Sequence, residues 1–274
     1  MTTSVAAVIQ MTTSPDVEAN LATARGLLER AHAQGAVLAA LPENFAIMGR
    51  KESDKVAVAE IAGEGPIQAF LGHTARELGM WIVGGTIPIR DEAEPQRVAA
   101  ASLVFDERGR NVARYDKIHL FDVDIPGREA ERYLESASAR AGTRVVTAAL
   151  PSARIGMTVC YDIRFPALFH RLSVLGTEVL VVPAAFTVPT GEVHWRPLLQ
   201  ARAIESLVYI VAAAQCGEHA GGRKTYGHSL VIAPWGEIVG ELGTSPGVLC
   251  ADLDMIRLRE LREKFPVIQH RREL

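Results

Sequence analysis

Short β-rich runs alternate with helical patterns along most of the chain, and this alternation limits the fold more than any other feature. Residues 5–11 and 36–41 have the apolar character of strands, and the apolar side chains between them recur at helical spacing. The alternation continues through strand-like runs at 98–105, 178–182 and 208–215. Strands that alternate with helices are typical of sheets covered by helices. The sequence therefore predicts an α/β fold.

Cap and turn residues indicate where other elements begin and end. Ser14 is expected to cap the first helix, with Pro15 in the first helical position. Gly176 is expected to end a helix that opens at Pro166. Residues 122–142 are the longest stretch without a clear period, and such loops in compact domains are usually functional. Further helices are expected at 67–78, 194–205 and 254–264, further strands at 81–89, 111–115, 155–159, 228–233, 237–242 and 248–252, and an irregular loop at 183–191.

Size and charge exclude several classes of protein. The 274 residues, 48% of them hydrophobic, are enough for one large core. A net charge of −3 gives no strong field for nucleic acid or an anionic membrane, and no apolar run reaches the length of a membrane span. The start of the chain lacks the basic character of a secretory signal. The three cysteines are far apart, which favours free thiols in a reducing, cytoplasmic compartment, with Cys216 and Cys250 as inert packing residues.

Cys160 lies at the end of a predicted strand. Residues 155–159 are β-rich, a polar turn at Tyr161 and Asp162 follows, and Pro166 then opens a helix. A strand–elbow–helix arrangement exposes a nucleophile beside free backbone N–H groups. A buried cysteine is otherwise an inert packing residue, so this segment alone leaves both interpretations open.

Two other strand ends carry charged residues. The run 36–41 leads into Pro42 and Glu43, and the run 111–115 leads into Lys117. Either charge alone fits a solvated strand end. Because sites in α/β sheets assemble at the carboxyl ends of strands, the glutamate, the lysine and Cys160 together predict one site.

The three segments together resemble the nitrilase superfamily of carbon–nitrogen hydrolases, whose catalytic set is Glu, Lys and Cys. The motifs that carry the resemblance are Leu41-Pro-Glu43, Tyr115-Asp-Lys-Ile-His-Leu-Phe121 and Val159-Cys-Tyr-Asp-Ile-Arg-Phe-Pro166. The resemblance implies a four-layer α-β-β-α sandwich and a single domain over 1–274. It also implies a homodimer or higher homo-oligomer, with the tail at about 254–274 in the subunit contacts, and a reaction that needs no cofactor and no metal ion.

The resemblance also implies a role for each residue of the set. Cys160 attacks an amide carbonyl and forms a thioester, while Glu43 takes the thiol proton, protonates the leaving amine and then activates water. Lys117 stabilises the oxyanion together with the backbone N–H of Tyr161. Lysine suits this role better than arginine because a compact charge can reach a single oxygen.

A second glutamate follows the lysine in many members of the superfamily. Glu135 fits this place, although the chain has Ala141-Gly142 where the usual pattern has Pro-Gly. Glu129 and Glu131 lie nearby and are alternatives, and a solvated loop carboxylate is another.

Two arginines are candidates for holding a carboxylate of the substrate. Arg164 either binds the substrate or, together with Asp162, fixes the elbow. Arg202 is the second candidate, with an ion pair to Glu205 as the alternative. Three residues of the loop after 178–182 are expected to line the pocket: Phe186, Thr187 and Thr190.

Segments of the second half look most like the deaminated-glutathione amidases, and next most like the ω-amidases that act on 2-oxoglutaramate. Among these segments are Tyr226-Gly-His-Ser-Leu-Val231 and Val267-Ile-Gln-His-Arg-Arg272. Both substrates are 2-oxo acids with a distal amide. The resemblance thus implies a metabolite-repair amidase that forms 2-oxoglutarate and, from deaminated glutathione, cysteinylglycine. A nitrilase, a carbamoylase, an acyltransferase and a non-enzymatic binding protein are the alternatives.

Overall fold

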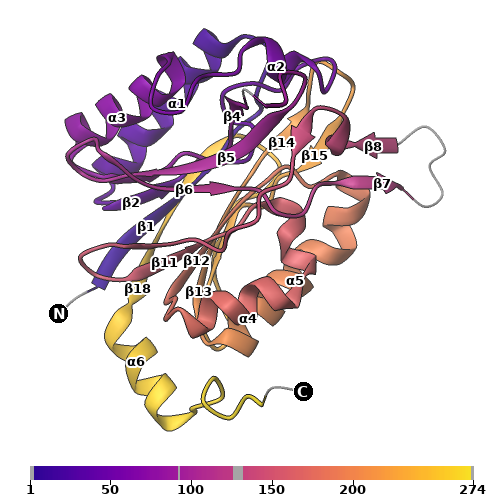
Figure 1. Ribbon diagram of the computed structural model, residues 1–274. Coiled ribbons are helices and arrows are strands. Elements are labelled where there is room, and N and C mark those ends of the chain that lie inside the picture. Colours follow the sequence, from indigo (N-terminus) through magenta and orange to yellow (C-terminus); the bar gives the residue numbers. More distant parts are fainter. Residues whose placement is uncertain (1–2, 92, 126–131, 273–274) are drawn as a thin grey trace.

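Two β-sheets lie face to face at the centre of the molecule, and helices cover the outer side of each (Figure 1). The structure is a computed structural model that describes residues 3–91, 93–125 and 132–272. The order of layers is helix, sheet, sheet, helix, which confirms the predicted four-layer α-β-β-α sandwich. None of the helices in the described part of the chain has the length and apolar character needed to span a bilayer.

The strands divide between the two large sheets and two short hairpins. The first sheet holds β18 (Gly247–Asp254), β1 (Thr3–Gln10), β2 (Leu38–Ala40), β3 (Trp81–Val83), β5 (Val98–Phe105) and β4 (Ile87–Arg90), with β6 (Asn111–Asp116) and β9 (Ala139–Arg140) also paired to β5. The second sheet holds β10 (Thr147–Ala149), β11 (Arg154–Met157), β12 (Val179–Ala184), β13 (Tyr209–Ala214), β16 (Leu230–Ile232) and β17 (Ile238–Glu241). The hairpins pair β7 (Asp122–Asp124) with β8 (Arg132–Leu134) and β14 (Cys216–Glu218) with β15 (Lys224–Tyr226).

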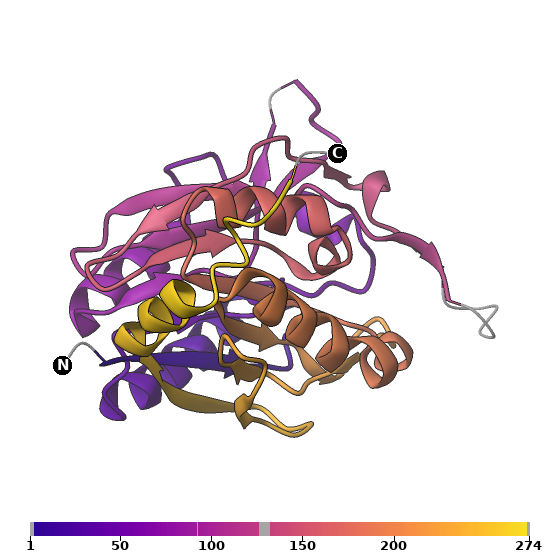
Figure 2. The same cartoon turned by 90° about the horizontal axis from the view of Figure 1, so that it is seen from below.

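The helices form the outer layers. The first sheet is covered by α1 (Val17–Ala33) and α3 (Pro66–Leu78), and the second by α4 (Pro166–Val174) and α5 (Val188–Ser206) (Figure 1). A short α2 (Asp54–Ala57) precedes α3, and α6 (Met255–Lys264) follows the last strand. After α6 the chain crosses α4 and α5 (Figure 2), where Arg271 donates to the hydroxyl of Ser173 and to the carbonyl of Glu205. The participation of the tail in subunit contacts stays a prediction.

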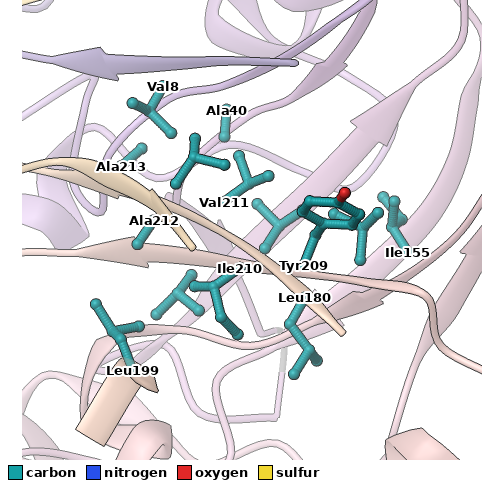
Figure 3. Close-up of a cluster of buried hydrophobic side chains, with 14 of the residues drawn as sticks. Val8, Ala40, Ile155, Leu180, Leu199, Tyr209, Ile210, Val211, Ala212 and Ala213 are labelled. Atoms are coloured by element: carbon teal, nitrogen blue, oxygen red, sulfur yellow. The ribbon is translucent and has the colours of Figure 1, made fainter. Parts of the chain in front are cut away.

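Successive side chains of a strand point to opposite faces of its sheet, so the first sheet contributes to two hydrophobic cores. On β1, Ala6 and Val8 point between the sheets, whereas Ala7 and Ile9 belong to the core under α1 and α3. Figure 3 shows Val8 among side chains of β13 in the core between the sheets. Full burial of each valine, leucine or isoleucine contributes roughly 1.5–3 kcal/mol. This packing fixes the two sheets against each other and so fixes the relative positions of their strand ends.

Strand direction brings the C-terminal ends of β2 and β6 to the same edge of the first sheet. β1, β2 and β3 are parallel in the first sheet, and β11, β12 and β13 are parallel in the second. β5 runs against β3, and β6 runs against β5, so β6 points the same way as β2.

Three predicted element boundaries are wrong for identifiable reasons. The first helix begins at Val17 with Asp16 as its cap, because Asp16 Oδ1 accepts the N–H of Ala19 at 3.0 Å. The Ser14 hydroxyl instead accepts the N–H of Asp16, which precedes the helix. The strand expected at 81–89 is divided into β3 and β4 at a glycine turn that includes Gly85. The loop expected to reach residue 191 ends earlier, because α5 already begins at Val188, with a proline in its first turn where no N–H is needed.

The described parts of the long aperiodic segment contain regular elements that the sequence does not indicate. Residues 122–142 contain β7, β8, a 3₁₀ helix at Glu135–Ala137 and β9. Residues 126–131, and with them Glu129 and Glu131, lie outside the described residues.

A substitution at Gly85 tests how tightly the loop that carries Glu43 is packed. A Cβ at Gly85 would lie 2.0 Å from the carbonyl oxygen of Pro42, and φ there is +50°. Gly79 has a similar φ of +58° but nothing within 4 Å of such a Cβ. We expect Gly79→Ala to lower the free energy of unfolding by about 1–2 kcal/mol from backbone strain alone. Gly85→Ala should lower it by roughly 1–3 kcal/mol more, since the carbonyl must move. Urea denaturation measures both, and equal losses would contradict the predicted clash.

Candidate active site

Three strand ends bring a glutamate, a lysine and a cysteine into one pocket. Glu43 follows β2, Lys117 directly follows β6, and Cys160 follows β11 from the opposite sheet. All three line the same pocket together with Glu135, which lies in the 3₁₀ helix of the segment after β8. The structure therefore assembles the four residues that the sequence placed in one site.

Lys117 is bound between two carboxylates. Its Nζ donates to Glu43 Oε1 at 2.7 Å and to Glu135 Oε2 at 2.8 Å. The Lys117 side chain is 1% exposed, and those of Glu43 and Glu135 are 4% and 10% exposed. Glu135 Oε2 also accepts the backbone N–H of Phe121 at 2.7 Å, which fixes the carboxylate in place.

The pKa values of Lys117 and Glu135 each depend on the charge of the other group. Burial works against the ammonium form of Lys117, but the carboxylates of Glu135 and Glu43 outweigh it and raise the pKa of Lys117 well above its ordinary value. Burial also works against the ionised form of Glu135, and Lys117 outweighs it and lowers the pKa of Glu135. The carboxylates thus favour the charged form of the lysine.

A buried aspartate shapes the elbow that carries Cys160. Asp162 is fully buried, and its Oδ2 accepts the N–H of Val159 at 2.8 Å and the hydroxyl of Tyr115 at 2.7 Å. Its Oδ1 accepts the N–H of His119 and lies 2.7 Å from His119 Nδ1. The bonds close a 3₁₀ helix at Cys160–Arg164, in which Cys160 takes a φ of +47°, unusual for a residue other than glycine. The predicted role of Asp162 in fixing the elbow is confirmed.

The thiol of Cys160 is held in its neutral form. Burial raises its pKa well above the ordinary value, and the neighbouring carboxylate of Glu43 raises it further. Lys117 acts in the opposite direction but does not outweigh the other two effects. Burial and the Glu43 carboxylate thus both disfavour the thiolate form of this cysteine.

The pocket includes most of the predicted binding residues and excludes one. Arg164 lines it, with its guanidinium 5.5 Å from the ring centre of Phe186 and its Nη2 3.2 Å from His194 Nδ1. Thr187 and Thr190 also line the pocket, with their hydroxyls 2.9 Å apart. Tyr161 lines the pocket as well.

Arg202 does not line this pocket, contrary to its assignment as a substrate-binding residue. Its Nε donates to the carbonyl of Ile163 at 2.9 Å, and its Nη1 donates to Glu205 at 2.8 Å. Arg202 lies on the side of α5 that faces the elbow, so the ion pair with Glu205 that the sequence left open is the arrangement found.

Seven lining residues were missed by sequence reasoning. They lie in loops or in the short elements α2 and β8: Asn44, Glu52, Lys55, Phe121, Tyr133, Ala185 and Arg223. Lys55 Nζ lies 2.6 Å from Glu52 Oε2, and Arg223 Nη1 lies 3.8 Å from Glu52 Oε1. The Arg223 guanidinium lies 5.1 Å from the ring centre of Tyr133. Among the described residues no group of three or more His, Cys, Asp or Glu side chains could hold a metal ion.

The layered sandwich and the pocket at its strand ends define a class of hydrolases that act on carbon–nitrogen bonds. The chain belongs to the carbon-nitrogen hydrolase family, whose model matches residues 5–263. It is 40% identical to a deaminated glutathione amidase of Synechocystis sp. over 97% of both chains. It is also 40% identical to the deaminated glutathione amidase of Homo sapiens, over 97% of this chain and 81% of the human one. The crystal structure of Saccharomyces cerevisiae Nit3, a member of branch 10 of the nitrilase superfamily, matches with a TM-score of 0.88 at 28% identity, over 99% of this chain and 97% of that one.

The raised pKa of Cys160 predicts how its alkylation depends on pH. In a Cys216→Ser/Cys250→Ser background, the rate of iodoacetamide labelling should still rise above pH 9, past the ordinary thiol value of about 8.5, because the thiolate is the reactive form. Glu43→Gln removes a negative neighbour, so the inflection should move to lower pH. A plateau below pH 8 in the parent protein, or an inflection that Glu43→Gln leaves in place, would contradict this electrostatic account.

Proposed function

We propose that this protein is an amidase that hydrolyses deaminated glutathione to 2-oxoglutarate and cysteinylglycine through a thioester on Cys160. The observation that carries the proposal is the buried ammonium of Lys117, held between Glu43 and Glu135 in the pocket of Cys160. The choice of substrate is supported by relatives named deaminated glutathione amidase, which are 40% identical over 97% of this chain.

The first half-reaction forms the thioester. Because the thiol is neutral, Glu43 takes its proton as the sulfur attacks the amide carbonyl carbon. Glu43 uses Oε1 to bind Lys117, which leaves its second carboxylate oxygen for this proton. The carbon–nitrogen bond then breaks, and Glu43 passes the proton to the leaving amine.

The second half-reaction releases the acid. A water molecule enters where the amine has left, Glu43 takes a proton from it, and the hydroxide attacks the thioester carbon. The carbon–sulfur bond breaks, the thiol of Cys160 regains its proton from Glu43, and the free acid leaves. The enzyme returns to its starting protonation state.

Two donors stabilise the oxyanion that forms in both steps. Lys117 supplies a fixed positive charge that Glu135 helps to position. Tyr161 is the second residue of the 3₁₀ helix, where backbone N–H groups have no partner within the helix, so its N–H is suited to the oxyanion. Loss of one such donor typically costs about 2.7–4 kcal/mol of transition-state stabilisation.

The acyl part of the substrate requires a cation for its 2-oxo carboxylate. Arg164 fits because it lines the pocket beside Phe186 and has no carboxylate partner among the ion pairs of the described residues. The hydroxyls of Thr187 and Thr190 offer hydrogen bonds to the oxo group. The proposal includes a reducing, cytoplasmic setting, which the free thiols of the chain suit, and a homo-oligomeric enzyme.

The substrate assignment is tested by comparing two amides. We expect kcat/KM for deaminated glutathione to exceed that for 2-oxoglutaramate by at least about tenfold, because a single additional charge-assisted hydrogen bond contributes about 1.5–3 kcal/mol. Cys160→Ala serves as the blank, and Cys216→Ser, a thiol outside the pocket, should retain turnover. A preference for 2-oxoglutaramate would make the protein an ω-amidase, and no turnover of either would reject the substrate class.

The role of Lys117 is tested by keeping its charge and changing its shape. Lys117→Arg should lower kcat by roughly 10²–10³, because the planar guanidinium cannot place one compact charge between Glu43 and Glu135. Arg262→Lys changes a half-buried cation of α6 outside the pocket and should leave kcat unaltered. Activity of Lys117→Arg within a few-fold of the parent enzyme would reject the proposed role.

A further inference from the structure

A second pocket opens directly outside the catalytic one. Five residues line both: Asn44, Glu52, Lys55, Tyr133 and Arg223. The outer pocket encloses about 660 Å³, compared with about 20 Å³ in the inner pocket. The inner pocket is therefore much the narrower of the two, and the outer one has the size of a small-molecule site.

The lining of the outer pocket is strongly basic although the chain has a net charge of −3. Its only acidic lining residue among the described parts of the chain is Glu52, against six cations: Arg50, Lys51, Lys55, Arg132, Arg223 and Lys224. The segments that supply them, around α2, β8 and the β14–β15 hairpin, lie on the same side of the molecule in Figure 1. A concave site lined by one sign of charge concentrates ligands of the opposite sign.

Several of these cations retain capacity for a ligand. No ion pair within the described residues involves the side chains of Arg50 and Lys51, which are exposed. Arg223 donates to the carbonyl of Ala185 at 2.7 Å, but its buried Nε has no hydrogen-bond partner within the described residues. Lys224 Nζ lies 3.3 Å from Glu218 Oε2, but both side chains are exposed, and exposed ion pairs contribute little stability.

We propose that the outer pocket is the subsite for the leaving amine and binds its terminal carboxylate, with Arg50 and Lys51 at the mouth and Arg223 where the two pockets join. The inference rests on the proposed function, since deaminated glutathione is an anion at both ends. Its 2-oxo carboxylate belongs to the acyl half, and its glycine carboxylate belongs to the cysteinylglycine that leaves. Arg164 lines the inner pocket only, so the two pockets offer separate cations to the two carboxylates.

Glu52 is the one group that opposes this assignment, and its contacts explain why it does not abolish the positive field. It is bound by Lys55 at 2.6 Å and lies 3.8 Å from Arg223, so it neutralises one cation at the inner end. Burial works against its ionised form, yet Lys55 outweighs it and lowers the pKa of Glu52. The mouth of the pocket thus keeps its positive charge.

The test compares deaminated glutathione with its terminal carboxamide, which has the same shape without the distal charge. Binding is measured by titration calorimetry on Cys160→Ala, and kcat/KM on proteins that retain Cys160. We expect the acid to bind about tenfold more tightly than the amide, with a preference that falls as salt is added. Arg50→Gln/Lys51→Gln and Arg223→Gln should each reduce the preference to about threefold or less. Arg257→Gln/Lys264→Gln, which removes two exposed charges from α6 at the other end of the molecule, should keep it.

The outcomes separate the subsite from the proposed function. Equal binding of acid and amide, or a preference that neither variant reduces, overturns the subsite, even if both compounds are hydrolysed. Preferential binding of the acid that the variants abolish supports the subsite, even if neither compound is hydrolysed, in which case the proposed function fails and the subsite stands.

Discussion

The ammonium group of Lys117, bound between two carboxylates, fixes the positions of segments from three parts of the chain. Burial of one cation with two anions carries a large desolvation penalty. Removing one partner of such a group typically destabilises the fold by about 3–5 kcal/mol, because a buried charge is left uncompensated. The strand ends that carry Glu43 and Lys117 and the 3₁₀ helix that carries Glu135 must therefore stay together. The Glu43 carboxylate that pairs with the lysine also raises the pKa of the Cys160 thiol.

The segment from Tyr115 in β6 to Phe121 links this cluster to Cys160. The hydroxyl of Tyr115 and the backbone of His119 bind Asp162, which shapes the elbow of Cys160. Between them in sequence lies Lys117, and Phe121 donates its N–H to Glu135. Strained backbone such as that of Cys160 persists only where its surroundings determine it, and here those surroundings are the sequence neighbours of Lys117. Displacement of this segment would thus disturb the contacts of Cys160, Lys117 and Glu135 together.

Sequence reasoning found the parts of the site that lie at regular positions. Glu43, Lys117 and Cys160 each follow a clear strand, and Glu135, chosen among three nearby glutamates, lies 2.8 Å from Lys117. It could not find Lys55 of the short α2 or Arg223 of the turn before β15, because only tertiary packing brings them to the pocket. It also could not exclude Arg202, since the face of α5 that meets the elbow depends on how the helix is rotated. The glycine turn at Gly85 was missed because neighbouring apolar residues hid the break between β3 and β4.

Mass analysis of the trapped acyl-enzyme is the most direct test of the claim that these groups act together on a carbon–nitrogen bond. Protein quenched in acid during turnover of deaminated glutathione would be digested and mapped. The account predicts a 2-oxoglutaryl group on Cys160, formed with one equivalent of cysteinylglycine and absent from Cys160→Ala. Product release without any covalent adduct, or an adduct on Cys216 or Cys250 instead, would contradict it.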